Sequence, residues 1–335
     1  MRKFTVAMLV AGFLFSVISS ISGQEMSESL VIYSGRSQSL VEPIFNRFSE
    51  DTGIPIEVRY AGTTELAATI LEEGDASPAD VFVAQDAGAL GALAYAGRLA
   101  ALPSDITERV EARFQSPAGL WIGLSGRARV LVYDTEQVTP DQLPDSLLDL
   151  TGEEWRGRVG WAPTNASFQA NVTAMRALWG EEATETWLRD MIANDVRVYP
   201  KNTPIVQAAI DGEVAVGLVN HYYLYRFLAE DPSVTAALHY FPNGDAGTLI
   251  NIAGAAILNT SENQGLAQRF ILYLLGAGAQ TYFAEETYEY PLAGGVEPSV
   301  DLVPLAEIEV PELDLSDLAD LAGTVRLLTT VGALP

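Results

Sequence analysis

The sequence contains no cysteine, and this excludes disulfide bonds, thiolate metal sites, iron–sulfur clusters and cysteine nucleophiles. It also excludes a lipid attached to an N-terminal cysteine. Only two lysines are present, Lys3 and Lys201, and neither belongs to a P-loop or a Ser-x-x-Lys motif. The two histidines, His221 and His239, leave little material for a zinc site. Much of common enzyme chemistry is therefore excluded.

Positive charge is also scarce. Lys and Arg number 19 against 44 Asp and Glu, which gives a formal net charge of −25. Such a chain repels phosphate backbones and anionic lipid surfaces, so we expect no nucleic-acid partner. In contrast, 48% of the 335 residues are hydrophobic. This is enough to build a large core and two domains, and it excludes wholesale disorder.

The N-terminus has the three parts of a secretory signal. Arg2 and Lys3 precede an apolar run over residues 6–15, and small residues follow over 16–23. The run is shorter than the roughly 20 apolar residues that cross a bilayer. We therefore predict that residues 1–23 are a cleaved signal peptide and that the mature protein is periplasmic. No later stretch is apolar enough to span a membrane.

The rest of the chain alternates between strand and helix patterns. Residues 30–33, 56–60 and 80–83 form three strand-like runs, and helix-like spacing of apolar residues separates them. This β-α-β-α-β order predicts a parallel sheet with crossover helices. The same logic returns in the second half, with strands expected at 159–161, 214–219 and 252–258. We predict an α/β fold with two lobes joined by short connections.

Ligands of open parallel sheets bind beyond the carboxyl ends of the strands, where helix N-termini expose N–H groups. In this sequence those positions carry small hydroxyl, amide and acidic residues: Ser34–Ser37, Ala61–Thr64, Gln85-Asp86, Thr164–Ser167 and Asn220–Tyr223. Such residues either cap helices only or cap them and also hold an anion. The sequence leaves both readings open.

Tyr222 and Tyr223 form the most informative pair. Neighbouring side chains of a strand face opposite ways, so both rings enter one cleft only at a turn or a helix start. A buried strand before them and an apolar stretch after them predict such a position. Two phenolates are hard oxygen ligands suited to a cation such as Fe³⁺, which would drive their deprotonation. Taken alone, however, a Tyr-Tyr pair more often serves core packing. We expect the neighbouring His221 at most to support the ligands through hydrogen bonds, without binding the metal itself.

Three arginines are candidates for holding an anion. Arg36 lies in the loop after the first strand, and Arg127 and Arg129 share one side of an expected strand. A guanidinium that points into a cleft can bind a carboxylate-like anion with two hydrogen bonds. The alternative is a surface salt bridge, which is common in a protein with 44 acidic residues.

Several motifs, in this order along the chain, resemble the ferric-ion-binding family of periplasmic solute-binding proteins, which serve ABC importers. The resemblance covers the whole mature region, and its markers are residues 31–35, 77–82, 124–130, 132–134, 157–164, 201–202, 220–223 and 289–292. It implies a type II-like fold with two lobes, hinge strands and an interlobe cleft. The first lobe would comprise residues 28–127 with 254–298, and the second 128–253 with 299–335.

The resemblance also implies site residues. The metal-binding tyrosines fall on Tyr222 and Tyr223, and the loop that holds the anion falls on Asn165, Ala166 and Ser167. Asn202 and Asn220 are further contacts. The protein would capture Fe³⁺ with a synergistic anion such as carbonate and deliver it, as a monomer, to the permease subunits of an ABC importer.

This chain departs from the family pattern at three positions. Ser37 and Gln85 replace a histidine and a glutamate that ligate the metal in some members, and Phe168 replaces an additional tyrosine. Only two tyrosine ligands therefore carry over. The remaining coordination would come from water or from an anion held by Arg36 and Arg127. Asp86 is a further candidate oxygen donor.

Two other functions remain open at this stage. The same architecture would also suit a small anion such as a phosphorylated sugar. A secreted hydrolase with a pair of catalytic carboxylates is the enzyme alternative. The acidic residues are scattered over expected helix surfaces, however, and no Gly-x-Ser-x-Gly motif is present. We therefore expect a binding protein and no enzyme.

Overall fold

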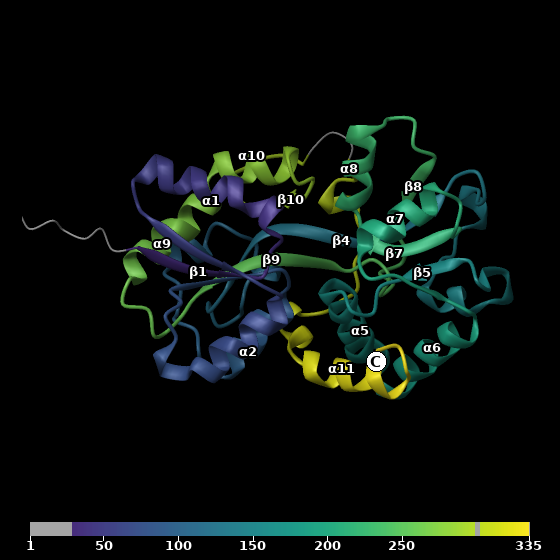
Figure 1. Ribbon diagram of the computed structural model, residues 1–335, viewed down its shortest axis with the longest axis horizontal. Coiled ribbons are helices and arrows are strands. Elements are labelled where there is room, and N and C mark those ends of the chain that lie inside the picture. The colour runs from purple at the N-terminus through teal and green to yellow at the C-terminus, as the bar shows by residue number, and fades with distance from the viewer. Residues whose placement is uncertain (1–28, 299–301, 335) are drawn as a thin grey trace, which may run out of the picture.

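The computed structural model of the protein describes residues 29–298 and 302–334 (Figure 1). The predicted signal peptide, residues 1–23, lies outside the described residues. The chain forms an α/β structure with two lobes, which lie at the left and the right of Figure 1. Strands from both lobes join in one path with the order β2-β1-β3-β9-β4-β7-β5-β6. This arrangement confirms the predicted fold class.

The first lobe begins with the predicted β-α-β-α-β unit. Strand β1 (Leu30–Ser34) lies between β2 (Ile56–Tyr60) and β3 (Val81–Ala84) and runs parallel to both. Crossover helices connect them and continue after β3: α1 (Gln38–Thr52), α2 (Thr63–Glu73) and α3 (Ala87–Tyr95). Short helical segments follow: η1 (Gly74–Ala76), α4 (Ser104–Thr107) and η2 (Ala112–Phe114). The strand ends 34–37, 61–64 and 85–86 consequently meet at one edge of the sheet.

The second lobe likewise contains parallel strands connected by helices, around a smaller sheet. Strand β5 (Val159–Trp161) pairs in parallel with β6 (Arg197–Val198) and β7 (Val216–Asn220). Its helices are α5 (Ala166–Trp179), α6 (Glu181–Ala193), α7 (Asn202–Ile210) and α8 (Tyr222–Glu230). Three short helices precede them: η3 (Pro140–Gln142), η4 (Leu147–Thr151) and η5 (Glu153–Trp155).

Two long strands cross between the lobes. Strand β4 (Ile122–Asp134) pairs antiparallel with β9 (Ile250–Ile257) through its first half, and with β7 and β8 (Ala236–His239) through its second half. Figure 1 shows β4 and β9 side by side across the middle of the molecule. Because the predicted lobe boundaries at 127/128 and 253/254 fall inside these continuous strands, the exact division into lobes stays a prediction.

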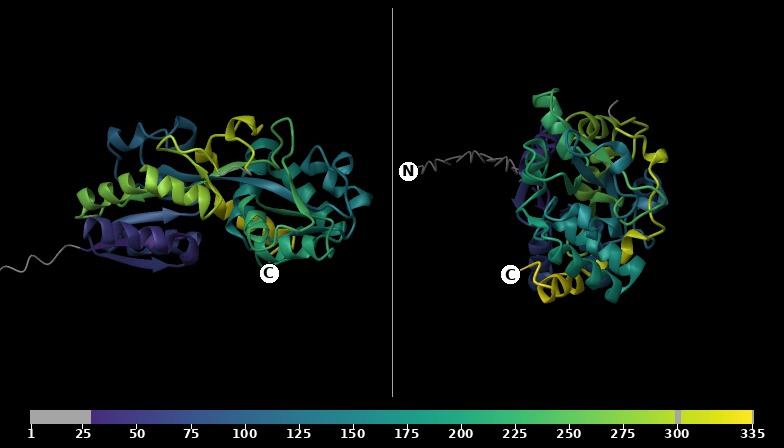
Figure 2. Two further views of the ribbon diagram at one scale, coloured as in Figure 1. Left: turned by 90° about the horizontal axis from the view of Figure 1, so that it is seen from above. Right: turned by 90° about the vertical axis from the view of Figure 1, so that its right-hand side faces the viewer.

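The chain then returns to the first lobe and ends on the second. Helices α9 (Gln264–Leu274) and α10 (Ala277–Glu285) lead to β10 (Tyr290–Pro291), which pairs with β4 at Ser125 and Gly126. The C-terminal part holds η6 (Leu305–Glu307), η7 (Leu315–Ala319) and α11 (Leu321–Thr330). Segment η7 packs against both α3 and α5, so it lies against both lobes. Figure 2 shows this C-terminal part along one side of the molecule.

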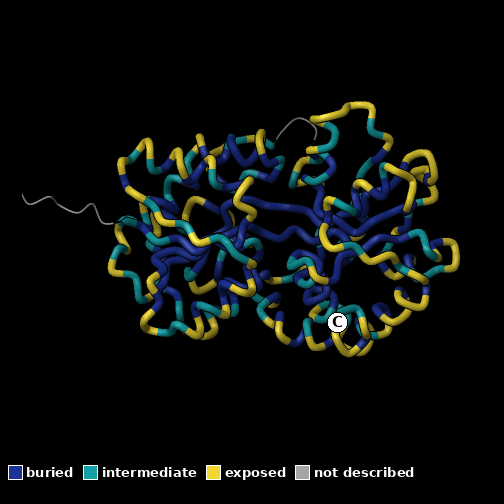
Figure 3. Tube along the Cα trace, viewed as in Figure 1, coloured by how far each residue is buried: buried dark blue, intermediate teal, exposed yellow. Residues whose placement is uncertain are grey.

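Each lobe is built on buried strands (Figure 3). The core of the first lobe includes an aromatic cluster in which Phe45 and Phe48 meet Phe270 edge to face, with ring centroids 5.1 Å apart in each pair. The second lobe has a separate core around Trp161, Trp187 and Phe168. Burying such rings contributes about 1.5–3 kcal/mol per side chain. In the part of the chain that the structure describes, no helix combines the length and apolarity needed to cross a bilayer.

Candidate metal-binding site

A cavity of about 390 Å³ lies between the two lobes. The first lobe contributes Gly35, Ser37, Leu40, Gly62, Thr63 and Gln85, and the second contributes Thr164, Asn165, Ala166, Pro200, Lys201, Thr203, Tyr223 and Arg226. The carboxyl ends of strands from both lobes therefore open onto one cleft, as expected for this type of sheet. The cavity contains several of the predicted site residues.

The two predicted tyrosines lie at the start of α8, directly after β7 and His221. Their rings stack at 4.4 Å between centroids with an interplanar angle of 33°. Tyr222 is buried, with 1% of its surface exposed, and Asn220 donates to its hydroxyl over 3.5 Å. Tyr223 reaches the cavity, and its phenol contacts those of Tyr222 and the amide of Asn202. Burial, followed by the neighbouring Tyr222, raises the pKa of the Tyr223 phenol well above its usual value.

Arg36 faces the tyrosines from the first lobe and is held by a buried carboxylate. Its Nη2 lies 2.6 Å from Oε1 of Glu289, and both side chains are almost fully buried. Its Nη1 is buried and has no partner. Burial opposes the charge of Arg36, but Glu289 and the two phenols outweigh it, and the pKa of the guanidinium is raised. Arg36 therefore presents a charged donor that is free to bind an anion.

Arg127 is the most exceptional side chain of the site. It is buried, with 1% exposed, and none of its three guanidinium nitrogens has a hydrogen-bond partner. Burial is the main cause that lowers its pKa, and Arg36 adds to this, whereas Tyr222 and Asp86 oppose it. Asp86 is itself buried with Oδ2 unpartnered, and burial raises its pKa against the effect of Arg127. A buried guanidinium without a partner is expensive, and a bound anion would supply the missing acceptors.

Arg129 lies two residues further along β4 and belongs to the second lobe. Its Nη1 donates to Oδ1 of Asn220 over 3.2 Å and to Oδ1 of Asn202 over 3.4 Å, while Nη2 stays without a partner. Burial and the nearby Arg127 lower its pKa to about 9. The burial of Arg127 and Arg129 shows that the alternative of a surface salt bridge was wrong for both.

The predicted anion loop forms the start of α5 and connects the two lobes. Asn165 is the N-cap, and its Oδ1 accepts from the backbone N–H of Ser167 over 3.0 Å and from Nδ2 of Asn202 over 3.4 Å. The Ser167 hydroxyl accepts from Nδ2 of Asn220 and from Nε2 of Gln85, each over 3.1 Å. Ala166 lines the cavity. Asn165 is thus a capping residue, and Gln85 makes a direct hydrogen bond across the cleft.

Three other positions named from the sequence have clear placements. Ser37 is exposed at the rim of the cavity. Phe168 is fully buried against Trp161, with ring centroids 5.4 Å apart, and does not line the cleft. His221 accepts a hydrogen bond at Nδ1 from the N–H of Ala128 and bonds the carbonyl of Tyr288 through Nε2. Burial is the main cause that lowers the pKa of His221 to about 4, so this side chain is a neutral link to the crossing strand.

Sequence reasoning missed two residues of the site as functional groups. Glu289 was noticed only as part of a family motif, although it pairs with Arg36 across 253 positions of the chain. Arg226 lines the cavity beside Lys201, and neither the spacing nor the local pattern singles it out. Lys201 is the only lysine after residue 3, so its presence at the cleft adds positive charge to an otherwise acidic protein.

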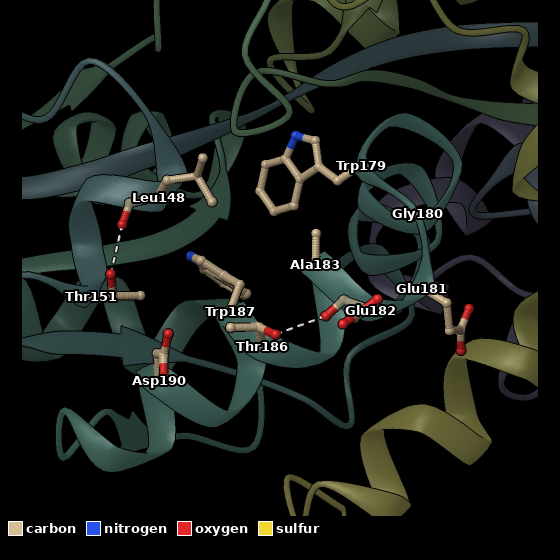
Figure 4. A pocket seen from close by; sticks show the side chains of 10 residues that line it. All are labelled: Leu148, Thr151, Trp179, Gly180, Glu181, Glu182, Ala183, Thr186, Trp187 and Asp190. Carbon is tan, nitrogen blue, oxygen red and sulfur yellow. Dashed lines mark hydrogen bonds between the residues drawn. The ribbon is translucent and has the colours of Figure 1, made fainter.

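A second hollow, of about 690 Å³, lies away from this cleft (Figure 4). It is lined by η4 and α6 and by Trp179 and Gly180, which come from the second lobe alone. Trp179 and Trp187 meet there with ring centroids 6.4 Å apart. The hollow contains none of the residues predicted to bind a ligand.

The cleft combines phenol oxygens with buried cations that lack acceptors. Residues 29–298 and 302–334 contain no group of three or more His, Asp or Glu side chains placed to hold a metal ion. The phenols of Tyr222 and Tyr223 contact one another in the cleft. Chemically, the arrangement can hold a hard cation on the phenols together with an anion on Arg36 and Arg127.

Comparisons with known proteins identify the family. Residues 76–309 match the model of the bacterial extracellular solute-binding proteins. The chain belongs to this family. The Fe(3+)-binding periplasmic protein of Serratia marcescens is 34% identical to this solute-binding protein over 92% of this chain and 91% of its own. The major ferric iron-binding protein of Neisseria meningitidis is 32% identical over 90% of this chain and 92% of its own.

Solved structures agree with these relatives. Iron-bound HitA from Pseudomonas aeruginosa is 35% identical, with a TM-score of 0.86 over 91% of this chain and 99% of its own. The family consists of binding proteins of transport systems, so this solute-binding protein is not an enzyme, and the hydrolase alternative is wrong.

Proposed function

We propose that this solute-binding protein captures Fe³⁺ in the interlobe cleft, with Tyr222 and Tyr223 as its protein ligands. The observation that carries the proposal is the stacked phenol pair beside buried guanidinium groups that lack acceptors. The ferric names of the relatives support the same cargo. Because the metal stabilises the phenolates, it would bind despite the raised pKa of Tyr223.

We further infer that a synergistic anion such as carbonate completes the coordination. Arg36 and Arg127 would bind it with the nitrogens that now lack partners. The N-terminal loop of α5, with Asn165, Ala166 and Ser167, would border it, and Asn202 and Asn220 would orient Arg129 and the phenols. Ser37 and Asp86 lie near the same space but supply no interaction that the proposal requires.

The mechanism follows from the position of the site. A ferric ion on the phenols of the second lobe, and an anion between Arg36 of the first lobe and the α5 loop of the second, would bridge the cleft and favour the closed state. We propose that the mature protein, after loss of its signal peptide, works as a periplasmic monomer. It would release the ion to the permease subunits of an ABC importer. No step of this cycle needs a nucleic acid.

Metal content and absorbance of the purified protein test the proposed cargo. Protein loaded with Fe³⁺ should hold about one ion per chain and show a visible tyrosinate-to-iron charge-transfer band. Tyr222→Phe should weaken and shift the band, because Tyr223 still supplies one phenolate, and it should weaken iron binding at least about a hundredfold, because one of two anionic ligands is lost. Tyr225→Phe on the same helix is the matched control and should keep both. A band that Tyr222→Phe leaves unchanged would show that Tyr222 is not a ligand, and protein that binds only anions would instead support the phosphorylated-sugar alternative.

A further inference from the structure

Glu289 is a buried carboxylate in the midst of the cations that face the cleft. It lies on the segment after α10, beside β10, and only 1% of its surface is exposed. Its Oε1 accepts from Nη2 of Arg36 over 2.6 Å, and its Oε2 accepts from the hydroxyls of Ser125 and Thr287 over 3.0 and 3.2 Å. The charge of Glu289 is therefore fixed in position and screened from water.

The buried charges of the site can be counted. Three guanidinium groups, Arg36, Arg127 and Arg129, stand against two carboxylates, Asp86 and Glu289. With all of these ionised, one positive charge is in excess. A ferric ion bound to two phenolates adds one more, so the loaded site carries two positive charges. A divalent anion balances them, whereas a trivalent anion leaves a buried negative charge, which is costly.

We propose that Glu289 sets the charge of the anion that the cleft accepts and favours divalent over trivalent oxyanions. This inference rests on the proposed function for the ferric ion on the two phenols and for the anion beside Arg36 and Arg127. The ionisation of Asp86 changes the absolute balance of the site, but loss of the Glu289 charge raises that balance by one whether or not Asp86 is ionised. The carboxylate acts on the anion through Arg36 and through the field of its charge, and it is a specificity-determining residue without being a ligand.

A purely structural role makes a different prediction. If Glu289 only positions Arg36, any substitution should weaken all anions in the same proportion. Glu289→Gln keeps the size and shape of the side chain and one acceptor oxygen, but it removes the charge and turns the other oxygen into an NH2 donor. Glu289→Asp keeps the charge but shortens the side chain. The two variants therefore separate charge from geometry.

The experiment measures binding of sulfate, a divalent anion, and citrate, a trivalent one, to the metal-free protein by calorimetry at fixed pH and ionic strength. We expect Glu289→Gln to raise the ratio of citrate affinity to sulfate affinity about tenfold, as one unit charge acting on one extra anionic charge predicts. Glu289→Asp should keep the ratio within about twofold of that of the original protein. Glu286→Gln, an exposed glutamate on the same segment, is the matched control and should also leave it unchanged.

Equal weakening of both anions in Glu289→Gln would overturn the proposal, as would Glu289→Asp shifting the ratio as strongly as Glu289→Gln. Iron loading of the same proteins gives a separate readout. Failure of the unsubstituted protein to bind Fe³⁺ with any anion would contradict the proposed cargo, while the ratio in the metal-free protein would still decide the role of Glu289. Circular dichroism of each variant shows whether it is folded before its ratio is compared.

Discussion

The two sides of the cleft present opposite chemistry. The first lobe contributes Arg36 with a free Nη1, and Arg127 at the crossing strand has no partner at all. The second lobe contributes the phenols of Tyr222 and Tyr223, with amides behind them. The side with Arg36 and Arg127, the anion side, is therefore suited to an anion. The side with Tyr222 and Tyr223, the phenol side, is suited to a metal ion. Under the proposed function, neither ligand alone would satisfy both sides, so cargo and anion together would favour closure over either one singly.

Lowering the pH should have the largest effect on iron affinity, because it acts on the phenol side of the cleft. Burial raises the pKa of Tyr223, so its phenol carries a proton in the metal-free protein, and Fe³⁺ must displace it. Affinity therefore rises with pH and falls as pH is lowered, by about tenfold per pH unit for each proton released. Titration of iron affinity between pH 8 and 6, with proton release followed in a weak buffer, measures this. An affinity independent of pH would mean that the phenols are not ligands.

The variant Phe168→Tyr tests whether a third phenol can be added to Tyr222 and Tyr223 as a metal ligand. Since Phe168 packs fully buried on Trp161, a hydroxyl at this position enters the apolar core and does not reach the cleft. We expect a loss of about 1–3 kcal/mol in the free energy of unfolding, measured by chemical denaturation, and an unchanged charge-transfer band. A shifted band with tighter iron binding would show that the ring can turn toward the site.

Arg127→Met tests the anion side. Removing a buried guanidinium without acceptors should stabilise the metal-free protein by about 1–3 kcal/mol, because the cost of burying the charge disappears. The same change should weaken iron binding in the presence of carbonate about tenfold. Thermal unfolding and iron titration measure the two effects. A simultaneous loss of stability would indicate that Arg127 has a structural partner instead of a ligand.

Gln85→Ala should have the smallest effect, because it removes one neutral hydrogen bond between the sides. The bond from Nε2 of Gln85 to the Ser167 hydroxyl is 3.1 Å long and contributes about 0.5–1.5 kcal/mol to holding the two lobes together. Iron affinity should fall only a few-fold, and solution scattering of the metal-free protein should show a larger average size. Gln38→Ala, whose exposed side chain bonds Glu42 within α1, is a suitable control. Unchanged affinity and size would mean that the bond does not contribute to closure.

Local patterns in the sequence were sufficient to predict much of the fold. Apolar periodicity predicts the parallel β1, β2 and β3, because each strand is short, buried and followed by an amphipathic helix. The same logic predicts the turn from β7 into α8 that brings Tyr222 and Tyr223 together. Helix boundaries were less secure. Helix α7, for example, begins at Asn202, which the sequence marked only as a candidate site residue.

The anion side was harder to predict, because its contacts join distant parts of the chain. The pair of Arg36 and Glu289 depends on the packing of the segment after α10 beside β4, which no local pattern encodes. Burial of Arg127 and Arg129 likewise depends on the packing around β4, whose two halves pair with β9 and β7, strands that are distant in the sequence. An alternating strand pattern reveals that two arginines share a face but not that the face is closed off from water.

The C-terminal segment constrains how the lobes can separate. Gly88 of α3 lies so close to the carbonyl of Leu318 that a Cβ there would approach this oxygen to 2.5 Å, while α11 continues onto α5. The segment of η7 and α11, packed against both lobes in this way, opposes a direct separation of the lobes. If this segment keeps both contacts, the lobes must open by a hinge rotation about an axis near it, and the cleft then opens most widely on the opposite side. The route by which cargo enters and leaves would then be set by the tail of the chain as much as by the crossing strands.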